Sequence, residues 1–220
     1  MSENWAVLGG LGGGLGVDGG MAEYMLVPSA RLLVPLGSLS PVKTAPLTDA
    51  ALTPYHAIKR ALPLLTPDAA VVVLGLGGLG HMAVQLLRLL APVRVIAADI
   101  DPAKLEHAKT LGAHDVINPG DGDAAAEQIL KIVGVRGVAL VLDCVGGRPT
   151  FDLGARILGR NSVWTIVGLG GGHHDFHAGS VPYGCMVSIP YWGSRVELME
   201  VIAMAREGQI HAEIAEFPPG

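Results

Sequence analysis

The chain has 220 residues, enough for one or two domains with a sizeable core. Its net charge of −5 argues against nucleic acid as a partner. Charged residues make up only 16%, yet no uninterrupted apolar run reaches the roughly 18 residues that a membrane helix needs, so we expect no membrane partner.

The first 20 residues are rich in glycine and are predicted to form a loop. They contain one GxGxxG pattern, from Gly14 to Gly19, which we reject as a nucleotide site because no strand precedes it and no helix follows. Residues 21–27 and 31–35 are predicted to be short strands.

A helical segment is predicted to begin at Asp49 and to be interrupted at Pro54. Taken alone, Asp49 is typical of a helix N-cap, and Thr53 of a residue that caps a turn before proline.

The most informative stretch starts with the β-branched residues 71–73. A glycine turn follows from Gly75 to Gly80, then a helix with apolar residues on one side. A second apolar run, residues 93–98, ends in Asp99. Strand, glycine turn, helix, strand and acidic residue form the dinucleotide-binding fingerprint in its required context.

Each part of this fingerprint has a physical role. Gly75 lets the chain turn off the strand, Gly77 lets the backbone approach a pyrophosphate, and Gly80 lets the helix pack closely. The helix N-terminus offers free N–H groups to the phosphates. Asp99 follows the glycines by about 20 residues, where a carboxylate can accept both ribose hydroxyls. This favours NAD over NADP, because a 2′-phosphate would face a carboxylate.

The rest of the chain alternates between helices and strands. Helices are predicted at residues 102–111, 124–133, 151–158 and 196–206, and strands at residues 115–117, 138–143, 162–167 and 186–190. Alternation of this kind predicts an α/β fold, a doubly wound parallel sheet with strand order 3-2-1-4-5-6. The turn at residues 144–147 is predicted to pack against adenine and ribose.

The sequence also contains a histidine cluster and two cysteines. The cluster His173, His174 and His177 could bind a metal ion, but it follows a glycine turn and no cysteine lies near it, which favours an exposed loop. Cys144 and Cys185 lie far apart without a CxxC pair. We therefore expect reduced, buried thiols in a cytoplasmic protein, in line with the lack of a signal-peptide pattern.

Several stretches resemble the zinc-dependent medium-chain alcohol dehydrogenases, and most of all their bacterial members that act on secondary alcohols and ketones. They are GGMAEYMLVPSARLLVP, PLTDAALTPYHAI, GLGGLGHMAVQLLR, VIAADIDPAKLEHAKTLGAHDVIN and PYWGSRVELMEVIAMAREGQI. The resemblance covers residues 19–217. It implies a remnant of a GroES-like β catalytic domain in residues 1–44, an NAD-binding Rossmann domain in residues 45–208, and the start of a return to the catalytic domain in residues 209–220.

The resemblance also implies roles for single residues. Asp49 matches the third ligand of the catalytic zinc, Thr53 a contact of the nicotinamide ring, and Lys104 a contact of the adenosine ribose, although a solvated surface lysine is an equal alternative. The predicted cofactor-binding residues are Thr53, Gly75, Gly77, Gly78, Leu79, Gly80, Asp99, Lys104, Cys144, Val145 and Val167.

The family's other features are not found in the sequence. It lacks the cysteine with its Ser or Thr proton relay, the His-Glu pair, the structural zinc lobe and the final helix and strand. Asp49 alone cannot hold a catalytic zinc, which needs about three protein ligands. We therefore expect a dehydrogenase truncated at both ends, without a complete catalytic set.

The leading hypothesis is an NAD-dependent alcohol dehydrogenase that transfers hydride between a small alcohol or ketone and NAD and is inactive as this chain alone. There are two alternatives: a zinc-free, NADPH-dependent reductase of the quinone-reductase kind, and a non-enzymatic nucleotide-binding module. Asp99 argues against the NADPH-dependent reductase, because a 2′-phosphate would face a carboxylate. The resemblance also implies a homodimer or homotetramer that pairs through residues 186–190.

Overall fold

The computed structural model describes residues 12–13 and 16–217. The chain divides into two compact units between Pro35 and Leu36, and each is described by itself. The domain boundary that we predict after residue 44 stays a prediction.

The first unit holds little regular structure in its described part. Two short strands, β1 (Gly12–Gly13) and β2 (Gly16–Val17), pair in parallel, and a 3₁₀ turn, η1, spans Ala30–Leu32. Gly14 and Leu15 of the rejected glycine pattern lie outside the described residues.

The strands predicted at residues 21–27 and 31–35 are wrong. Tyr24 and Leu26 are 89% and 90% exposed, and no neighbouring strand pairs with this stretch among the described residues. A strand without a partner leaves its backbone groups unpaired, so an apolar alternating pattern is not sufficient to form one. In the second stretch, the Ser29 side chain accepts a hydrogen bond from the Arg31 N–H and favours the turn η1.

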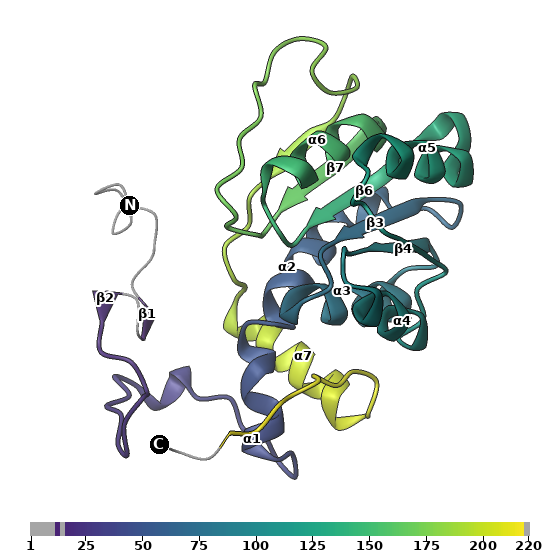
Figure 1. The fold of residues 1–220 in the computed structure, drawn as a ribbon. Helices are drawn as coiled ribbons and strands as arrows, with labels where there is room; N and C mark the ends of the chain where they lie inside the picture. The colour runs from purple at the N-terminus through teal and green to yellow at the C-terminus, as the bar shows by residue number, and fades with distance from the viewer. Residues whose placement is uncertain (1–11, 14–15, 218–220) are drawn as a thin grey trace. The chain divides into compact units, whose positions relative to one another are not determined.

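The second unit is built on a six-stranded parallel sheet with the order β5-β4-β3-β6-β7-β8, which is the predicted 3-2-1-4-5-6 order (Figure 1). In register, Val72 of the central strand pairs with Ile96 on one side and Val141 on the other. The strands are β3 (Ala70–Leu74), β4 (Arg94–Ala98), β5 (Asp115–Ile117), β6 (Val138–Asp143), β7 (Leu158–Ile166) and β8 (Met186–Ser188).

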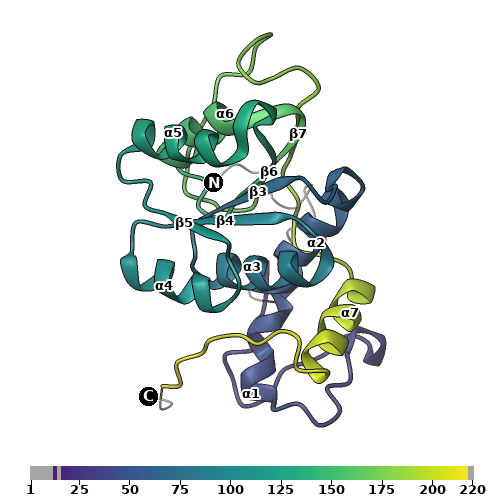
Figure 2. The ribbon, with the colours of Figure 1, turned by 90° about the vertical axis from the view of Figure 1, so that its right-hand side faces the viewer.

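Helices cover both faces of this sheet (Figure 2). On one face lie α3 (Gly78–Leu90) and α4 (Pro102–Thr110), and on the other α5 (Gly122–Val133) and α6 (Arg148–Ile157). Outside α3 lies α2 (Leu52–Ala61), and α7 (Arg195–Arg206) packs against α2. The shorter helices are α1 (Pro41–Thr44), η2 (Ala45–Thr48), η3 (Leu62–Leu64) and η4 (Gly134–Arg136).

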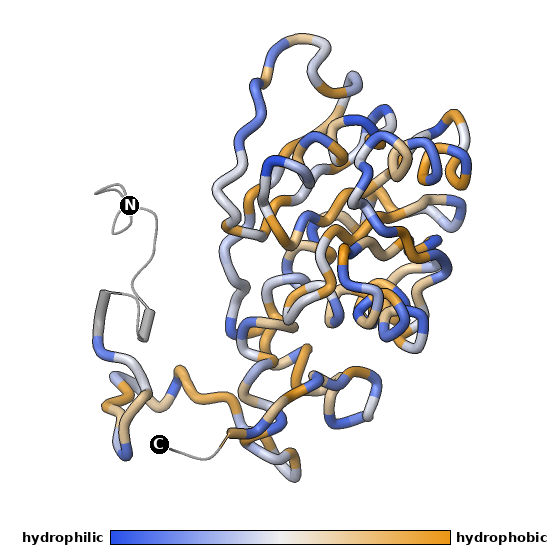
Figure 3. The backbone as a smooth tube through the Cα atoms, in the orientation of Figure 1, coloured by the Kyte–Doolittle hydropathy of each residue, from blue (hydrophilic) through white to orange (hydrophobic). Residues whose placement is uncertain are grey.

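The core follows the strands. The side chains of residues 71–74 are fully buried, as are Ile96, Leu142 and Trp164 on neighbouring strands. Figure 3 shows the strands of the sheet as hydrophobic over most of their length, as expected for a parallel sheet that helices cover on both faces. No described helix is both long and apolar enough to cross a bilayer.

Pro54 does not interrupt α2, contrary to the prediction. The helix begins at Leu52, so Pro54 lies in its first turn, where the backbone N–H has no partner within the helix in any case. Asp49 is also not the N-cap of this helix. That position belongs to Ala51, and Asp49 ends the preceding turn η2.

Candidate functional site

The glycine turn after β3 has the geometry that its sequence predicts. Gly75 has a φ of +86°, a left-handed conformation that favours glycine, and its N–H donates to the Ala98 carbonyl at 2.8 Å. A Cβ on Gly80 would overlap the Gly75 carbonyl oxygen. The predicted roles of Gly75 in the turn and of Gly80 in close packing are therefore confirmed.

Gly77 differs from these two glycines because it faces open space. A Cβ built on it would meet no atom within 4 Å. Gly77 is the N-cap of α3, so the unpaired N–H groups of the first helical turn lie beside this space. A backbone that is open at a helix N-terminus suits an approaching phosphate group.

Asp99 is fixed at the carboxyl end of β4. Only 8% of it is exposed, and its Oδ2 accepts a hydrogen bond from the Leu76 N–H at 2.7 Å. Its Oδ1 accepts from the Asp101 N–H at 2.9 Å. Lys104 Nζ lies 3.8 Å from Oδ2. Each carboxylate oxygen has a further lone pair, so the group can still accept hydrogen bonds from hydroxyls.

These groups line one cleft of about 390 Å³. Every predicted cofactor-binding residue except Thr53 and Val167 lines it, and the predicted zinc ligand Asp49 does too. The lining residues are Asp49, Ala50, Gly75, Gly77, Gly78, Leu79, Gly80, Asp99, Lys104, Cys144 and Val145. The structure thus brings together the glycines of the fingerprint, the acidic residue Asp99 and the turn at residues 144–145. That these residues bind a cofactor stays a prediction.

The turn after β6 is organised by Asp143, which sequence reasoning missed. Asp143 is fully buried, and its Oδ1 accepts from the N–H groups of Val145 at 2.9 Å and Gly146 at 2.8 Å. Its backbone carbonyl accepts from Val167 N–H at 2.9 Å, which ties the next strand to the same turn. An acidic residue that ends an apolar strand was the signal available in the sequence.

This turn contributes Cys144 and Val145 to the lining of the cleft, and its burial affects the pKa values of nearby groups. Burial raises the pKa of the Asp143 carboxyl, although its backbone hydrogen bonds oppose that shift. Desolvation and the neighbouring Asp143 raise the pKa of the Cys144 thiol. Cys144 and Cys185 are free, as predicted, but half-buried rather than buried.

Asp49 and Thr53 contact each other. The Thr53 hydroxyl donates to Asp49 Oδ1 at 2.9 Å, and Thr53 is buried. Within the described residues, no three His, Cys, Asp or Glu side chains gather where they could hold a metal ion. The donors present therefore do not fit a catalytic zinc site, and Asp49 as a ligand stays a prediction.

The histidine cluster is spread over an exposed loop, as expected. His173 and His177 are exposed, whereas the His174 ring packs edge-on against Trp164, with ring centres 5.4 Å apart. Phe176 lies against the same histidine, at 5.0 Å between ring centres. His174 therefore serves packing against β7.

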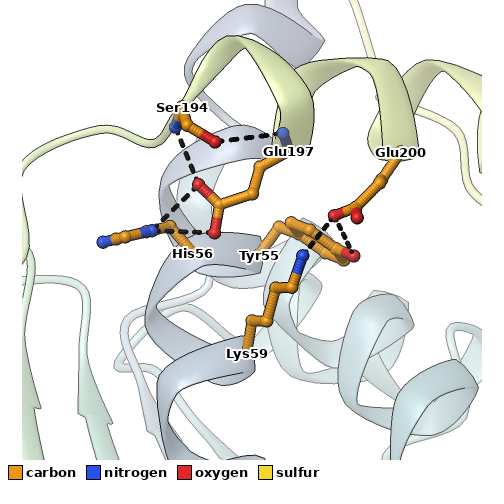
Figure 4. A network of polar contacts seen from close by, with 6 residues as sticks. All are labelled: Tyr55, His56, Lys59, Ser194, Glu197 and Glu200. Atoms are coloured by element: carbon orange, nitrogen blue, oxygen red, sulfur yellow. Dashed lines mark hydrogen bonds and ion pairs between the residues drawn. The ribbon is translucent and has the colours of Figure 1, made fainter.

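A polar network joins α2 to α7 (Figure 4). His56 Nδ1 lies 2.9 Å from Glu197 Oε1, and Glu197 Oε2 accepts from the Ser194 N–H at 2.7 Å. The Ser194 hydroxyl accepts from the Glu197 N–H, which completes a capping box. Burial opposes ionisation of Glu197, but hydrogen bonds from Ser194 and His56 hold its pKa below the usual range.

The second half of this network centres on Glu200. Its Oε2 accepts from the Tyr55 hydroxyl at 2.8 Å and from Lys59 Nζ at 2.5 Å. The Lys59 ammonium and the Tyr55 hydroxyl lower the pKa of Glu200, while burial and that carboxylate raise the pKa of Tyr55. The network holds α2, and thus the Asp49 turn, against α7. The Ser194-x-x-Glu197 pattern, typical of a capping box, is the one signal of this network in the sequence.

Comparisons with known proteins agree with this geometry. The profile of the zinc-binding dehydrogenases matches residues 78–204. The chain is 33% identical over 202 residues to the NAD-dependent alcohol dehydrogenase of Sulfurisphaera tokodaii, covering 90% of this chain and 56% of that protein. It is 32% identical over 206 residues to the D-arabinose 1-dehydrogenase (NADP(+)) of Saccharolobus solfataricus, covering 91% of this chain and 58% of that protein.

A solved structure, the alcohol dehydrogenase of the hyperthermophilic archaeon Aeropyrum pernix, superposes with a TM-score of 0.83 at 37% identity. The superposition covers 91% of this chain and 58% of that one. The chain thus spans little more than half the length of the relatives that it matches. Because the family profile matches more than half of its residues, the chain belongs to the zinc-binding dehydrogenase family.

Proposed function

We propose that the cleft beside Gly77 binds NAD, and that the chain is the coenzyme-binding part of an alcohol dehydrogenase. NAD, when bound, supplies the nicotinamide that accepts or donates hydride. The observation that carries the proposal is the fixed carboxylate of Asp99 next to the open N-terminus of α3.

The residues of the cleft fit the parts of this cofactor. The first-turn N–H groups of α3 and the open space at Gly77 suit a pyrophosphate. The Asp99 carboxylate would accept hydrogen bonds from the hydroxyls of the adenosine ribose, and Lys104 would contact the same ribose. Val145, 41% exposed, offers an apolar surface for adenine.

Asp99 also supports the choice of NAD over NADP. A 2′-phosphate would stand against a buried carboxylate, and like charges close together in a poorly solvated site repel. The family includes both kinds of enzyme, since one relative carries NADP(+) in its name. Titration of the chain with NADH and with NADPH, followed by nucleotide fluorescence, tests the choice. Tighter NADPH binding to the unmodified chain would contradict it.

The whole reaction is a proposal as well. We propose hydride transfer between a small alcohol or ketone and NAD, as the relatives' names suggest. The described residues do not fit a zinc site, so no step is assigned to zinc in this chain. The same finding supports a second candidate, a nucleotide-binding module without its own catalysis. We expect this chain alone to form no NADH from a secondary alcohol; turnover would show that it has its own catalysis and would rule out the second candidate.

We further propose a homodimer or homotetramer that pairs through β8. This edge strand and the residue after it leave Met186, Val187 and Ile189 between 39% and 75% exposed. An unpaired apolar edge invites pairing with a second copy. The two free thiols favour a cytoplasmic location.

A further inference from the structure

The segment after α7 runs along the outside of α3 (Figure 2). Ile210 is almost fully buried, and the next residue is held by the side-chain amide of Gln85. Gln85 Nε2 donates to the His211 carbonyl at 3.0 Å, and Gln85 Oε1 accepts from the His211 N–H at 3.1 Å. One side chain therefore binds both backbone groups of one residue and fixes the segment on the helix.

Two residues further along, the same segment reaches His81. The Glu213 N–H lies 3.3 Å from His81 Nε2, and His81 Nδ1 lies 3.0 Å from the Gly77 carbonyl oxygen. A backbone N–H can only donate and a carbonyl can only accept, so Nε2 accepts and Nδ1 carries the hydrogen. The neutral Nδ1–H form of this buried imidazole makes both contacts together.

The contact with the Gly77 carbonyl orients the peptide group that faces the proposed phosphate position. The Gly77 carbonyl also accepts the backbone N–H of His81 at 3.1 Å, so two donors hold it toward the body of α3. In a trans peptide, the carbonyl and the following N–H point in opposite directions. Holding the Gly77 carbonyl therefore aims the Gly78 N–H out of the helix end. Gly77, which lacks a Cβ, would otherwise fix this plane poorly.

We infer that His81 is a positioning residue that couples segment 210–213 to the proposed phosphate cradle. The inference rests on the proposed function, because the cradle matters only if a dinucleotide binds there. Coupling of this kind is reciprocal. An intact segment tightens cofactor binding, and bound cofactor in turn holds the segment on α3.

Four variants of the full chain separate these contacts. Gln85→Ala removes the clamp on His211. His81→Asn keeps a donor near Nδ1 but cannot reach Glu213, whereas His81→Gln reaches toward Glu213 but lacks the donor for Gly77. Gln128→Ala, an exposed glutamine on α5 on the other face of the sheet, is the matched control.

Two measurements are made on each variant: NADH affinity by fluorescence titration, and deuterium exchange of residues 209–217 with and without NADH. Because one aligned hydrogen bond is involved, Gln85→Ala and both His81 variants should bind NADH about threefold to tenfold more weakly. NADH should slow exchange of the segment in the parent and in Gln128→Ala, but not in the His81 variants. A purely structural histidine would not change this response.

Two results would overturn the inference. In the first, the parent and all variants bind NADH equally well, and NADH does not change deuterium exchange of the segment. The coupling is then absent, while the proposed function stands. If the parent binds no NADH, the proposed function fails and the coupling fails with it. Circular dichroism reports folding of each variant, and Gln85→Ala, which leaves the glycine turn and His81 in place, decides the matter if the His81 variants unfold.

Discussion

Gly77 and Gly80, the N-cap and an early residue of α3, should respond in opposite ways to the same added methyl group. Gly77 has an ordinary φ of −73°, and a Cβ there would meet nothing within 4 Å. The cost of Gly77→Ala to folding should therefore be about 1 kcal/mol or less, the usual penalty for alanine at an N-cap. Yet the methyl would occupy the space through which a pyrophosphate approaches, so NADH affinity should fall about tenfold or more, or ~1.4 kcal/mol and above.

Gly80→Ala should show the opposite pattern, with a large loss of stability and only an indirect effect on NADH binding. Its Cβ would overlap the carbonyl oxygen of Gly75, a backbone atom that cannot rotate away. Overpacking of this kind costs about 1–3 kcal/mol or more in the free energy of unfolding. Any loss of NADH binding by Gly80→Ala would then follow from the disturbed turn.

Urea unfolding followed by circular dichroism, and NADH titration of the folded protein, measure both variants beside the parent. NADH binding by Gly77→Ala as tight as that of the parent would show that no phosphate approaches this position. A Gly80→Ala variant that unfolds at the parent's urea midpoint would show that the overlap has no energetic consequence.

Four further predictions follow from the same structure. Asp99→Gly should erode the preference for NADH over NADPH, measured as the ratio of the two dissociation constants; an unchanged ratio would remove Asp99 from cofactor choice. The pKa of Glu197 is lowered in the folded state, so its contribution to stability is present above the usual carboxyl pKa and is lost as pH falls through the lowered value. Urea midpoints from neutral to acid pH should therefore depend less on pH in Glu197→Gln, and identical pH profiles would contradict this. Light scattering at micromolar concentration should show a dimer or larger species, and Ile189→Lys beside β8 should shift it toward monomer; a monomeric parent would disprove pairing through β8. With secondary alcohols and added zinc the chain should form no NADH, and turnover that Asp49→Ala abolishes would prove this expectation wrong.

The sheet could be predicted from sequence because its signals are local. Residues 71–73 and the glycines after them define a strand and a turn without help from distant residues, and the alternation that follows fixes a parallel sheet. Strand order then follows from the fold class. The cleft follows too, because the carboxyl ends of β3, β4 and β6 meet at one edge.

The predictions that the structure contradicts concern segments whose conformation depends on contacts with residues far away in the sequence. Residues 21–27 alternate like a strand, but the described part of the chain gives them no partner. The effect of Pro54 depends on its position relative to the start of α2, and the sequence alone does not fix where this helix begins. The contacts of Asp143 with its own turn, and of His81 with Glu213, depend on buried geometry that no spacing in the sequence encodes.

One equilibrium titration shows whether the cleft beside Gly77 is an NAD site. The purified chain is titrated with NADH, and in parallel with NADPH, while nucleotide fluorescence is followed. We expect saturable binding of NADH that is tighter than binding of NADPH. Absence of saturable NADH binding by a folded chain, or tighter binding of NADPH, would contradict it.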